Sequence, residues 1–380
     1  MTLLIRTLVL ALLAVGLSAC GDSQSVASPD DPGPFAVGHS SFTAVDTTRG
    51  NRSLLVDAWY PVDADDAQDS PLTEYLLLGP VSLPSEVAVD DLPVSERPGQ
   101  TLLVFSHGYQ SIHIQSFGLM EALASHGFIV ISPEHTGNAQ ASPTDTFDEA
   151  AANRVPDVSF LIDTMFDRNR DSGDPFYGRI DEKSVGVVGH SFGAMTGIGM
   201  ASGWADAEPD PRVTAIVPIS AVIDGEMQSD QREGPNAGFT EAQLASITVP
   251  VMLIGGTEDI NVPIGNNAIA FAQLVNAPRV YKVDVIGATH THFAAICPIG
   301  DALIDFGWGP EVWPMVAEDL IEPYETTCGP AAFPIEEATR LQSLYVVAFF
   351  KRHMLNRIGY DRYLTTDFAD TEDAITFSLK

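Results

Sequence analysis

Short, continuous runs of branched apolar residues recur along the chain, and they constrain its fold more than any other feature. Within each run the apolar positions do not alternate with polar ones, as is expected of strands that are covered on both faces of a sheet. Segments with helical patterning separate the runs, and this alternation predicts a mainly parallel sheet with helices on both faces. The strand-like runs are residues 101–106, 128–132, 184–188, 213–219, 249–254 and 280–285, and the helix-like segments are residues 116–125, 150–166, 192–202, 266–275 and 335–354.

The remaining segments do not divide this series into two cores. Residues 42–46 and 53–60 are typical of a hairpin of two antiparallel strands at one edge of the sheet. Three insertions, residues 62–100, 133–153 and 221–247, are each too short to fold as an independent cap. We therefore predict a single α/β domain over residues 35–380, without a large cap domain.

The first residues have the composition of an export signal. Arg6 precedes an apolar stretch that ends at Leu17, and this stretch is shorter than the ~20 residues that a membrane-spanning helix needs. The small residues before Cys20 resemble a bacterial lipobox, in which the cysteine is lipidated and becomes the new N-terminus. We predict a signal peptide over residues 1–19, a lipidated tether over residues 20–34, and a membrane-anchored bacterial lipoprotein on the periplasmic or cell-surface side. An ordinary secretory signal with an incidental cysteine is the alternative.

Two further cysteines, Cys297 and Cys328, form an even pair in a chain that is predicted to be exported. An oxidising compartment favours a disulfide between them, and two buried thiols are the alternative. For a closed loop of roughly thirty residues, the chain-entropy account gives a stabilisation of about 3–4 kcal/mol. The sequence has no Cys-x-x-Cys pair and no Cys/His cluster with metal-ligand spacing, so we predict neither a metal nor a cofactor.

The chain also carries a large excess of acidic residues. Asp and Glu number 51 and Lys and Arg 19, which gives a formal net charge of −32. Such a surface repels phosphate backbones and anionic bilayers, which argues against nucleic acid as a partner. We expect contact with a membrane through the N-terminal lipid only, and the charge does not define an oligomeric state.

A G-x-S-x-G sequence, Gly189 to Gly193, follows directly on the strand-like run 184–188 and opens a helix-like segment. At a sharp turn between strand and helix the flanking glycines let the backbones approach without side-chain clashes, and the serine is exposed above the sheet. The turn also places that serine at the positive end of the following helix. Ser191 is therefore the candidate nucleophile.

A serine hydroxyl needs a base to accept its proton at neutral pH. His290 comes immediately after the last strand-like run, so a loop there would bring its imidazole over the carboxyl edge of the sheet. His292, two residues later, is the competing candidate. His190 adjoins the nucleophile, and we expect it to pack against a loop or to orient one.

The base in turn needs a carboxylate that fixes its tautomer and stabilises the imidazolium. Asp259 lies just after the strand-like run 249–254 and is the first candidate. Asp224, after the preceding strand, is the alternative, and Glu258 adjoins Asp259 but is expected to face differently. The order Ser191, Asp259, His290 is that of the α/β-hydrolase triad.

An oxyanion that forms during attack on a carbonyl requires fixed hydrogen-bond donors. One candidate is the backbone N–H of Phe192, the residue after the nucleophile. The other should come from the loop after the strand-like run 101–106, where the sequence reads Ser-His-Gly-Tyr. Its histidine-glycine pair lets the main chain curl towards the serine, so Tyr109 N–H is the candidate donor.

Together the segments FSHGY, GHSFGA, GGTED and GATH resemble the bacterial branch of the platelet-activating-factor acetylhydrolase and dienelactone-hydrolase-like α/β-hydrolases. The resemblance runs from about Ser53 to the C-terminal helix, and the GATHTHF segment is similar to the family pattern that carries the catalytic histidine, here His290. Animal acetylhydrolases take their acid from the strand before Ala221, whereas the GGTED segment is similar to bacterial cutinase-like polyester hydrolases and supports Asp259. Dienelactone hydrolases proper use cysteine, so Ser191 argues against that activity.

The resemblance implies an α/β-hydrolase fold and a serine carboxylic-ester hydrolase that forms an acyl-enzyme. The expected substrates are short-acyl or otherwise accessible esters, including phospholipid esters of the acetylhydrolase type. A cutinase-like polyester hydrolase is one alternative, and a non-catalytic lipoprotein that uses the fold to bind a ligand is another. The same acyl-enzyme chemistry also serves proteases and acyltransferases, so the motifs do not distinguish the acceptor.

Overall fold

The computed structural model describes residues 27–229 and 233–380. The predicted signal peptide, Cys20 and the first part of the tether lie outside these residues. The end of the tether is fixed to the domain, because Asp30 pairs with Arg340 at 3.0 Å and the backbone N–H of Gly33 donates to Ser125 Oγ at 2.9 Å. Within the described ranges, no helix has the length and apolar character to cross a bilayer.

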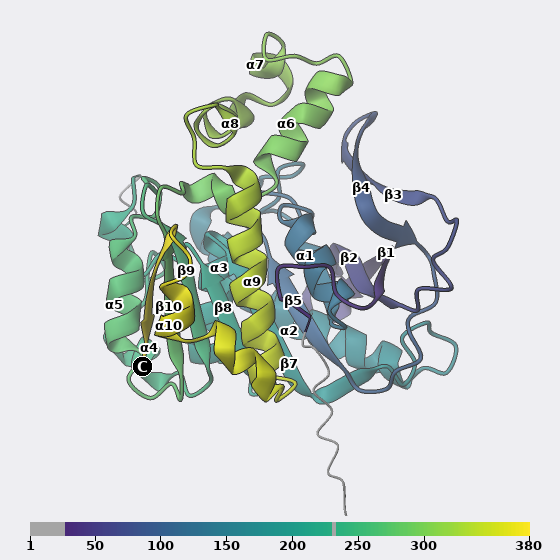
Figure 1. Ribbon diagram of the computed structural model, residues 1–380, viewed down its shortest axis with the longest axis horizontal. Helices are drawn as coiled ribbons and strands as arrows, with labels where there is room; N and C mark the ends of the chain where they lie inside the picture. Colours follow the sequence, from purple (N-terminus) through teal and green to yellow (C-terminus); the bar gives the residue numbers. More distant parts are fainter. Residues whose placement is uncertain (1–26, 230–232) are drawn as a thin grey trace, which may run out of the picture.

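One eleven-stranded sheet forms the centre of the protein (Figure 1), with the strand order β11-β10-β9-β8-β7-β5-β6-β2-β1-β4-β3. Strands β6, β5, β7, β8, β9 and β10 are parallel neighbours, while β2 joins β6, and β11 joins β10, in antiparallel pairs. The strands are β1 Ala36–Asp46, β2 Arg52–Val62, β3 Leu72–Leu78, β4 Val81–Asp90, β5 Gln100–Ser106, β6 Ile129–Glu134, β7 Ile180–His190, β8 Val213–Ile219, β9 Val251–Gly256, β10 Val280–Val285 and β11 Ile375–Leu379.

Helices cover both faces of the sheet, because nearly every central-strand side chain is apolar and requires burial. One face packs against α2, α3, α4 and α5, and the other packs against α1, α9 and α10. The helices are α1 Phe117–Ser125, α2 Phe147–Arg170, α3 Phe192–Ser202, α4 Glu241–Ser246, α5 Gly265–Gln273, α6 Ile296–Asp305, α7 Trp313–Val316, α8 Ile321–Cys328, α9 Ile335–His353 and α10 Thr366–Ala369. The predicted α/β architecture is confirmed.

Helix α2 is important for the site because it crosses behind the loop that follows β5. A capping box fixes its start: Thr146 Oγ1 accepts the backbone N–H of Glu149, and the Glu149 carboxylate accepts the backbone N–H of Thr146. Its buried face carries apolar residues that pack on the sheet, and it also carries Arg154 and Asp157, both fully buried. A buried cation and anion on an otherwise apolar helix face require polar partners.

The predicted hairpin of residues 42–46 and 53–60 is present as the longer antiparallel pair β1 and β2, with Ala36 opposite Val62. The insertion of residues 62–100, predicted as a loop, contains a second hairpin, β3–β4, which extends the sheet. Its side chains alternate between buried and exposed, a period-two pattern that the acidic and proline-rich composition obscured. Helix α4 in the insertion 221–247, and the final strand β11, were likewise not predicted.

A small helical layer covers the carboxyl edge of the sheet, and the sequence analysis did not predict it. We call this layer the lid; it comprises α6, α7 and α8, residues 296–328, and it lies above the sheet beside the β3–β4 hairpin (Figure 1). A disulfide between Cys297 and Cys328 joins its two ends, as predicted for this cysteine pair. The lid has its own apolar cluster around Trp313, which includes Val81 of the hairpin. Lid and hairpin therefore pack against each other over the sheet edge.

Candidate active site

Ser191 occupies a strained turn between β7 and α3. Its backbone angles, φ 58° and ψ −118°, are ones that residues with a side chain rarely adopt. A Cβ on Gly189 would lie 2.2 Å from the carbonyl oxygen of Gly193, and a Cβ on Gly193 would lie 1.8 Å from that of Ser106. Only glycine fits at these two positions. The first turn of α3 therefore packs directly on the end of β5 and presents Ser191 at the helix N-terminus.

The carboxylate of Asp259 is held in one orientation and paired with His290. Its Oδ1 accepts the backbone N–H groups of Asn261 at 3.0 Å and Val262 at 2.7 Å, and its Oδ2 accepts Nδ1–H of His290 at 2.7 Å. Burial by itself would raise the pKa of Asp259, but the nearby His290 and these hydrogen bonds outweigh it and hold that pKa below its usual range. An ionised Asp259 keeps the His290 proton on Nδ1, so that Nε2 is the nitrogen that can accept a proton.

The alternative residues lie elsewhere. His292 is buried, and both of its ring nitrogens are hydrogen-bonded: Nδ1 accepts the backbone N–H of Thr289 at 2.9 Å, and Nε2 donates to the carbonyl oxygen of Phe333 at 2.9 Å. Asp224 follows β8 and caps a short 3-10 helix, Gly225–Met227. Glu258 is exposed. Each of these side chains has a structural role or faces solvent, whereas Asp259 and His290 face each other.

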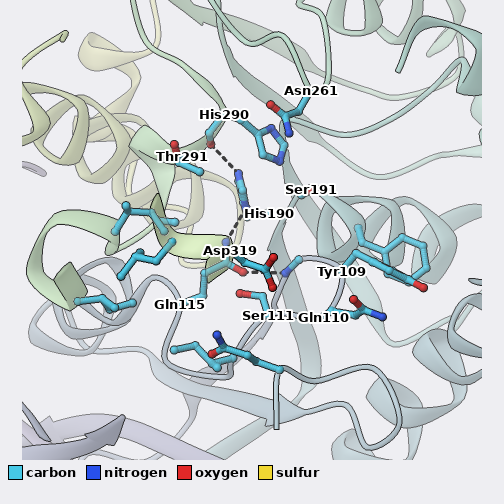
Figure 2. Close-up of a pocket in the computed structure, with 18 of the residues that line it drawn as sticks. Tyr109, Gln110, Ser111, Gln115, His190, Ser191, Asn261, His290, Thr291 and Asp319 are labelled. Atoms are coloured by element: carbon cyan, nitrogen blue, oxygen red, sulfur yellow. Dashed lines mark hydrogen bonds between the residues drawn. The ribbon is translucent and has the colours of Figure 1, made fainter. Parts of the chain in front are cut away.

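Ser191 and His290 line the same cavity, which has a volume of about 380 Å³ and lies at the carboxyl edge of the parallel strands (Figure 2). This volume lies within the range of small-molecule sites. The lid and the β3–β4 hairpin supply much of its apolar lining, which the sequence analysis therefore missed. The apolar residues that line it include Leu77, Leu78, Phe147, Met195, Val222, Ile296, Ile299, Leu303 and Leu320. Among the residues that the structure describes, no cluster of three or more His, Cys, Asp or Glu side chains could hold a metal ion.

The two predicted oxyanion donors belong to segments that meet beside Ser191. A Cβ on Gly108 would lie 3.6 Å from the Cβ of Ser191, so the loop after β5 passes directly alongside the nucleophile. Phe192 is the first residue of α3, and the N–H groups of a first helical turn have no carbonyl partner within the helix. The rings of Tyr109 and Phe192 pack at right angles with centroids 5.3 Å apart. The loop and the helix start are thus locked together.

His190 links these loops through a chain of hydrogen bonds, part of which Figure 2 shows. Gly108 N–H donates to Gln115 Oε1 at 2.7 Å, the Gln115 amide donates to His190 Nδ1 at 2.5 Å, and His190 Nε2–H donates to the His290 carbonyl at 2.9 Å. Burial, together with the nearby His290, lowers the pKa of His190 to about 3, so the ring is neutral and keeps this pattern. His190 thus orients a loop, as expected. No local motif indicated Gln115.

The buried neutral histidines predict a loss of stability in mild acid. Burial lowers the pKa of both His190 and His135 to about 3. The unfolded chain takes up these protons near pH 6.5 and the folded protein only near pH 3, so the stability they contribute is complete above pH 6.5 and is lost as pH falls. Each group lowers the free energy of unfolding by up to about 1.4 kcal/mol per pH unit in this window.

Urea unfolding at pH 7.5, 6.5, 5.5 and 4.5 measures this slope. His190→Gln retains an uncharged side chain with a donor and an acceptor but does not titrate, so its free energy of unfolding should fall less steeply with acid than that of the wild type. A wild-type stability that is flat between pH 6.5 and 4.5, or a variant with an unchanged slope, would contradict the prediction.

The chain is similar in sequence to several known proteins. The chlorophyllase family model matches residues 93–279. The platelet-activating factor acetylhydrolase of Cavia porcellus is 25% identical over 44% of this chain, and the match spans only 50% of the acetylhydrolase. Cutinase 1 of Thermobifida cellulosilytica and the cutinase of Thermobifida fusca (strain YX) are each 25% identical over 56% of this chain, and the matches span 72% and 63% of their lengths.

A solved structure has the same fold. The ferulic acid esterase of Streptomyces cinnamoneus superimposes with a TM-score of 0.60 at 22% identity, covering 93% of this chain and 98% of that chain. At this identity the neighbour shows that the fold is shared. The chain has an α/β-hydrolase fold and is similar in sequence to an acetylhydrolase and to cutinases.

Proposed function

We propose that the protein is a serine carboxylic-ester hydrolase in which Ser191, His290 and Asp259 form the catalytic triad. The observation that carries this proposal is the Asp259–His290 hydrogen bond of 2.7 Å in the cavity that the strained Ser191 lines. Each residue follows a different parallel strand, and the carboxyl ends of these strands meet at one edge of the sheet. Backbone strain of this kind is concentrated at functional sites, which supports a catalytic role for Ser191.

The geometry supports an acyl-enzyme mechanism. Nε2 of His290 takes the proton of the Ser191 hydroxyl as Oγ bonds to the ester carbonyl carbon, and the anionic Asp259 stabilises the imidazolium. The N–H groups of Tyr109 and Phe192 hold the negative oxygen of the tetrahedral intermediate. His290 then protonates the departing alcohol, water adds to the acyl carbon by the same proton transfers, and the acid is released with Ser191 restored.

The lining of the cavity supports a small ester with an apolar acyl group. Apolar side chains of the lid and of the β3–β4 hairpin line the same cavity as Ser191. A cavity of about 380 Å³ with this lining suits a small ester, which favours short-acyl esters, including phospholipid esters of the acetylhydrolase type, over polyesters. The strongly acidic chain also disfavours highly anionic substrates.

Ester hydrolysis and labelling by a fluorophosphonate probe test the triad. Ser191→Ala should abolish both, and Asp259→Asn should lower kcat for p-nitrophenyl acetate by about 10³–10⁴-fold, because a neutral amide cannot hold the His290 tautomer or stabilise the imidazolium. Asp224→Asn is the matched control and should hydrolyse the ester at the wild-type rate. If Asp224→Asn were the inactive variant and Asp259→Asn the active one, the acid of the triad would be Asp224. If the wild type took up no probe, the chain would be a binding protein rather than an enzyme.

A series of p-nitrophenyl esters with acyl chains from two to sixteen carbons tests the substrate class. We expect kcat/KM to be highest for short chains and to fall once the acyl group exceeds the cavity of about 380 Å³. The same preparation should release little product from a polyester film. Faster release from the film than from the short esters would instead favour the cutinase-like alternative.

We also propose that Cys20 is lipidated and anchors the protein to a bacterial membrane on its exported side. The small residues before Cys20 and the polar segment after it support this proposal. Expressed in a bacterium, the full chain should fractionate with membranes and incorporate labelled palmitate, while Cys20→Ser should do neither and retain esterase activity. Incorporation of label into Cys20→Ser would contradict it.

A further inference from the structure

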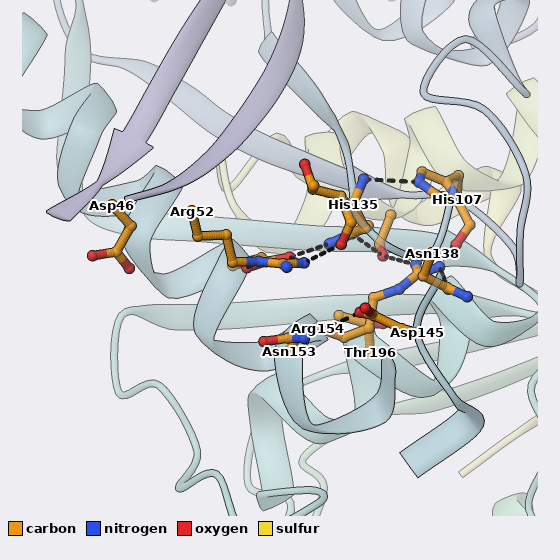
Figure 3. Close-up of polar contacts among 12 residues, drawn as sticks. Asp46, Arg52, His107, His135, Asn138, Asp145, Asn153, Arg154 and Thr196 are labelled. Carbon is orange, nitrogen blue, oxygen red and sulfur yellow. Dashed lines mark hydrogen bonds and ion pairs between the residues drawn. The ribbon is translucent and has the colours of Figure 1, made fainter. Parts of the chain in front are cut away.

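Arg154 of α2 is a fully buried cation directly behind the loop that follows β5 (Figure 3). Its Nη1 donates to the carbonyl oxygen of His107 at 2.5 Å and to Ser106 Oγ at 3.1 Å, and its Nη2 donates to the carbonyl oxygen of Gly108 at 2.9 Å and to Asn138 Oδ1 at 2.6 Å. All four acceptors are uncharged. Burial lowers the pKa of Arg154 to about 9, which still leaves it cationic at neutral pH. A buried charge that is held by neutral oxygens is costly, and two of these oxygens belong to the loop that passes the nucleophile.

The hydrogen bonds to the Gly108 carbonyl oxygen determine where the N–H group of Tyr109 points. The Gly108 carbonyl oxygen accepts from Arg154 and, at 2.8 Å, from Nδ1–H of His107. In a planar trans peptide the C=O and the following N–H point in opposite directions, so the N–H of Tyr109 is directed away from Arg154. The same stretch of loop passes beside Ser191, because a Cβ on Gly108 would lie 3.6 Å from that of Ser191.

We propose that Arg154 is a positioning residue that aims the Tyr109 N–H into the oxyanion hole. The inference rests on the proposed esterase function and adds a residue to it that touches neither substrate nor reacting atoms. Arg154 also reaches the second donor segment, since its guanidinium lies 4.9 Å from the centre of the Phe192 ring. One cation thus contacts both segments that supply oxyanion donors.

A second layer of hydrogen bonds fixes the orientation of Arg154. Burial lowers the pKa of His135 to about 3, so this ring is neutral, and its Nδ1–H donates to Asp157 at 2.9 Å. His135 Nε2 therefore accepts the hydroxyl proton of Ser106 at 3.1 Å, which leaves Ser106 Oγ free to accept from Arg154. Asp157 is held in turn by Arg52 at 2.7 and 2.8 Å. The protons of His135 Nδ1 and of the Ser106 hydroxyl therefore each have one defined acceptor.

The planar fork of arginine is what this position requires. Its two terminal nitrogens reach the carbonyl oxygens of consecutive residues, His107 and Gly108, and hold both peptides at once. A lysine ammonium carries the same charge but is a single point on a flexible stem, so it cannot fix two peptide planes. Arg154→Lys therefore separates the effect of charge from that of geometry.

The test compares Arg154→Lys, Arg154→Gln and the milder Ser106→Ala with the wild type. For p-nitrophenyl acetate we expect kcat in the Arg154 variants to fall by up to about 100-fold with little change in KM. Complete removal of an oxyanion donor lowers kcat by at least about this factor. The rate of phosphonylation by a fluorophosphonate should fall by the same factor, because the phosphonyl oxygen occupies the same hole. Ser106→Ala should lower kcat and the phosphonylation rate by a smaller factor, and the factor should be the same for both.

Arg168→Gln is the matched control on the same helix. Arg168 pairs with Asp174 at 2.7 Å and stacks on Phe42, away from the loop after β5, so its loss should lower stability without changing either rate. All rates are measured per active serine, titrated with the probe, and the unfolding midpoint of each variant is recorded separately. Activity of Arg154→Ala should also recover in part when guanidinium ion is added.

The proposal would be overturned if Arg154→Lys or Arg154→Gln had the wild-type kcat and phosphonylation rate per active serine. Arg154 would then be a structural residue, however low the unfolding midpoint of the variant. Should both Arg154 variants fail to fold, Ser106→Ala decides: unchanged rates in that variant would overturn the proposal. Failure of the underlying esterase function has a different signature, since the wild type itself would then neither take up the probe nor hydrolyse the ester.

Discussion

The contact between the first turn of α3 and the end of β5 is the constraint on which the site depends. Gly193 lies so close to the Ser106 carbonyl oxygen that any side chain there would push the helix away. This approach brings the strained Ser191 beside Gly108, and with it the two segments that supply the candidate oxyanion donors. An oxyanion site works through N–H dipoles that are fixed before the reaction begins. A shift of the helix would therefore separate the nucleophile from these N–H groups.

Two hydrogen-bond networks converge on Gly108 from opposite directions. Its N–H donates to Gln115, which leads through His190 to the backbone of His290, and its carbonyl oxygen accepts from Arg154. The loop that runs past the nucleophile is therefore tied both to the candidate base and to helix α2. The low pKa of His190 keeps its ring neutral, so that Nδ1 can accept from Gln115 while Nε2 donates to His290.

The cover of the site is made from parts of the chain that are far apart in sequence. The lid follows the loop of His290, while the β3–β4 hairpin precedes the first parallel strand, and the two share an apolar cluster around Trp313. The disulfide joins the ends of the lid next to the same loop, and the hydroxyls of Thr291 and Thr327 meet there at 2.5 Å. The shape of the cavity is thus coupled to the segment that carries His290.

Local signals in the sequence identified the parallel strands, the helices between them and the turn at Ser191. A buried strand is a continuous apolar run, and the spacing of the glycines indicates the turn, so both can be recognised without knowing the segments they pack against. The position of Asp259 and His290 directly after strands was sufficient to nominate them. The β3–β4 hairpin and the lid were missed because their short apolar patterns are interrupted by prolines, glycines and acids, and because part of their burial comes from contact with each other.

The sequence by itself therefore determined the α/β architecture and nominated Ser191, Asp259 and His290, because strand ends and glycine spacing are local properties. The tertiary structure alone decided that Asp259 rather than Asp224 faces His290, that both nitrogens of His292 are hydrogen-bonded elsewhere, and that Arg154 lies behind Gly108. These outcomes depend on which side chains meet across long sequence separations. The sequence around a single arginine, glutamine or aspartate is the same whether the residue lies at the surface or in a buried network. Only the packing of the sheet and its helices distinguishes the two cases.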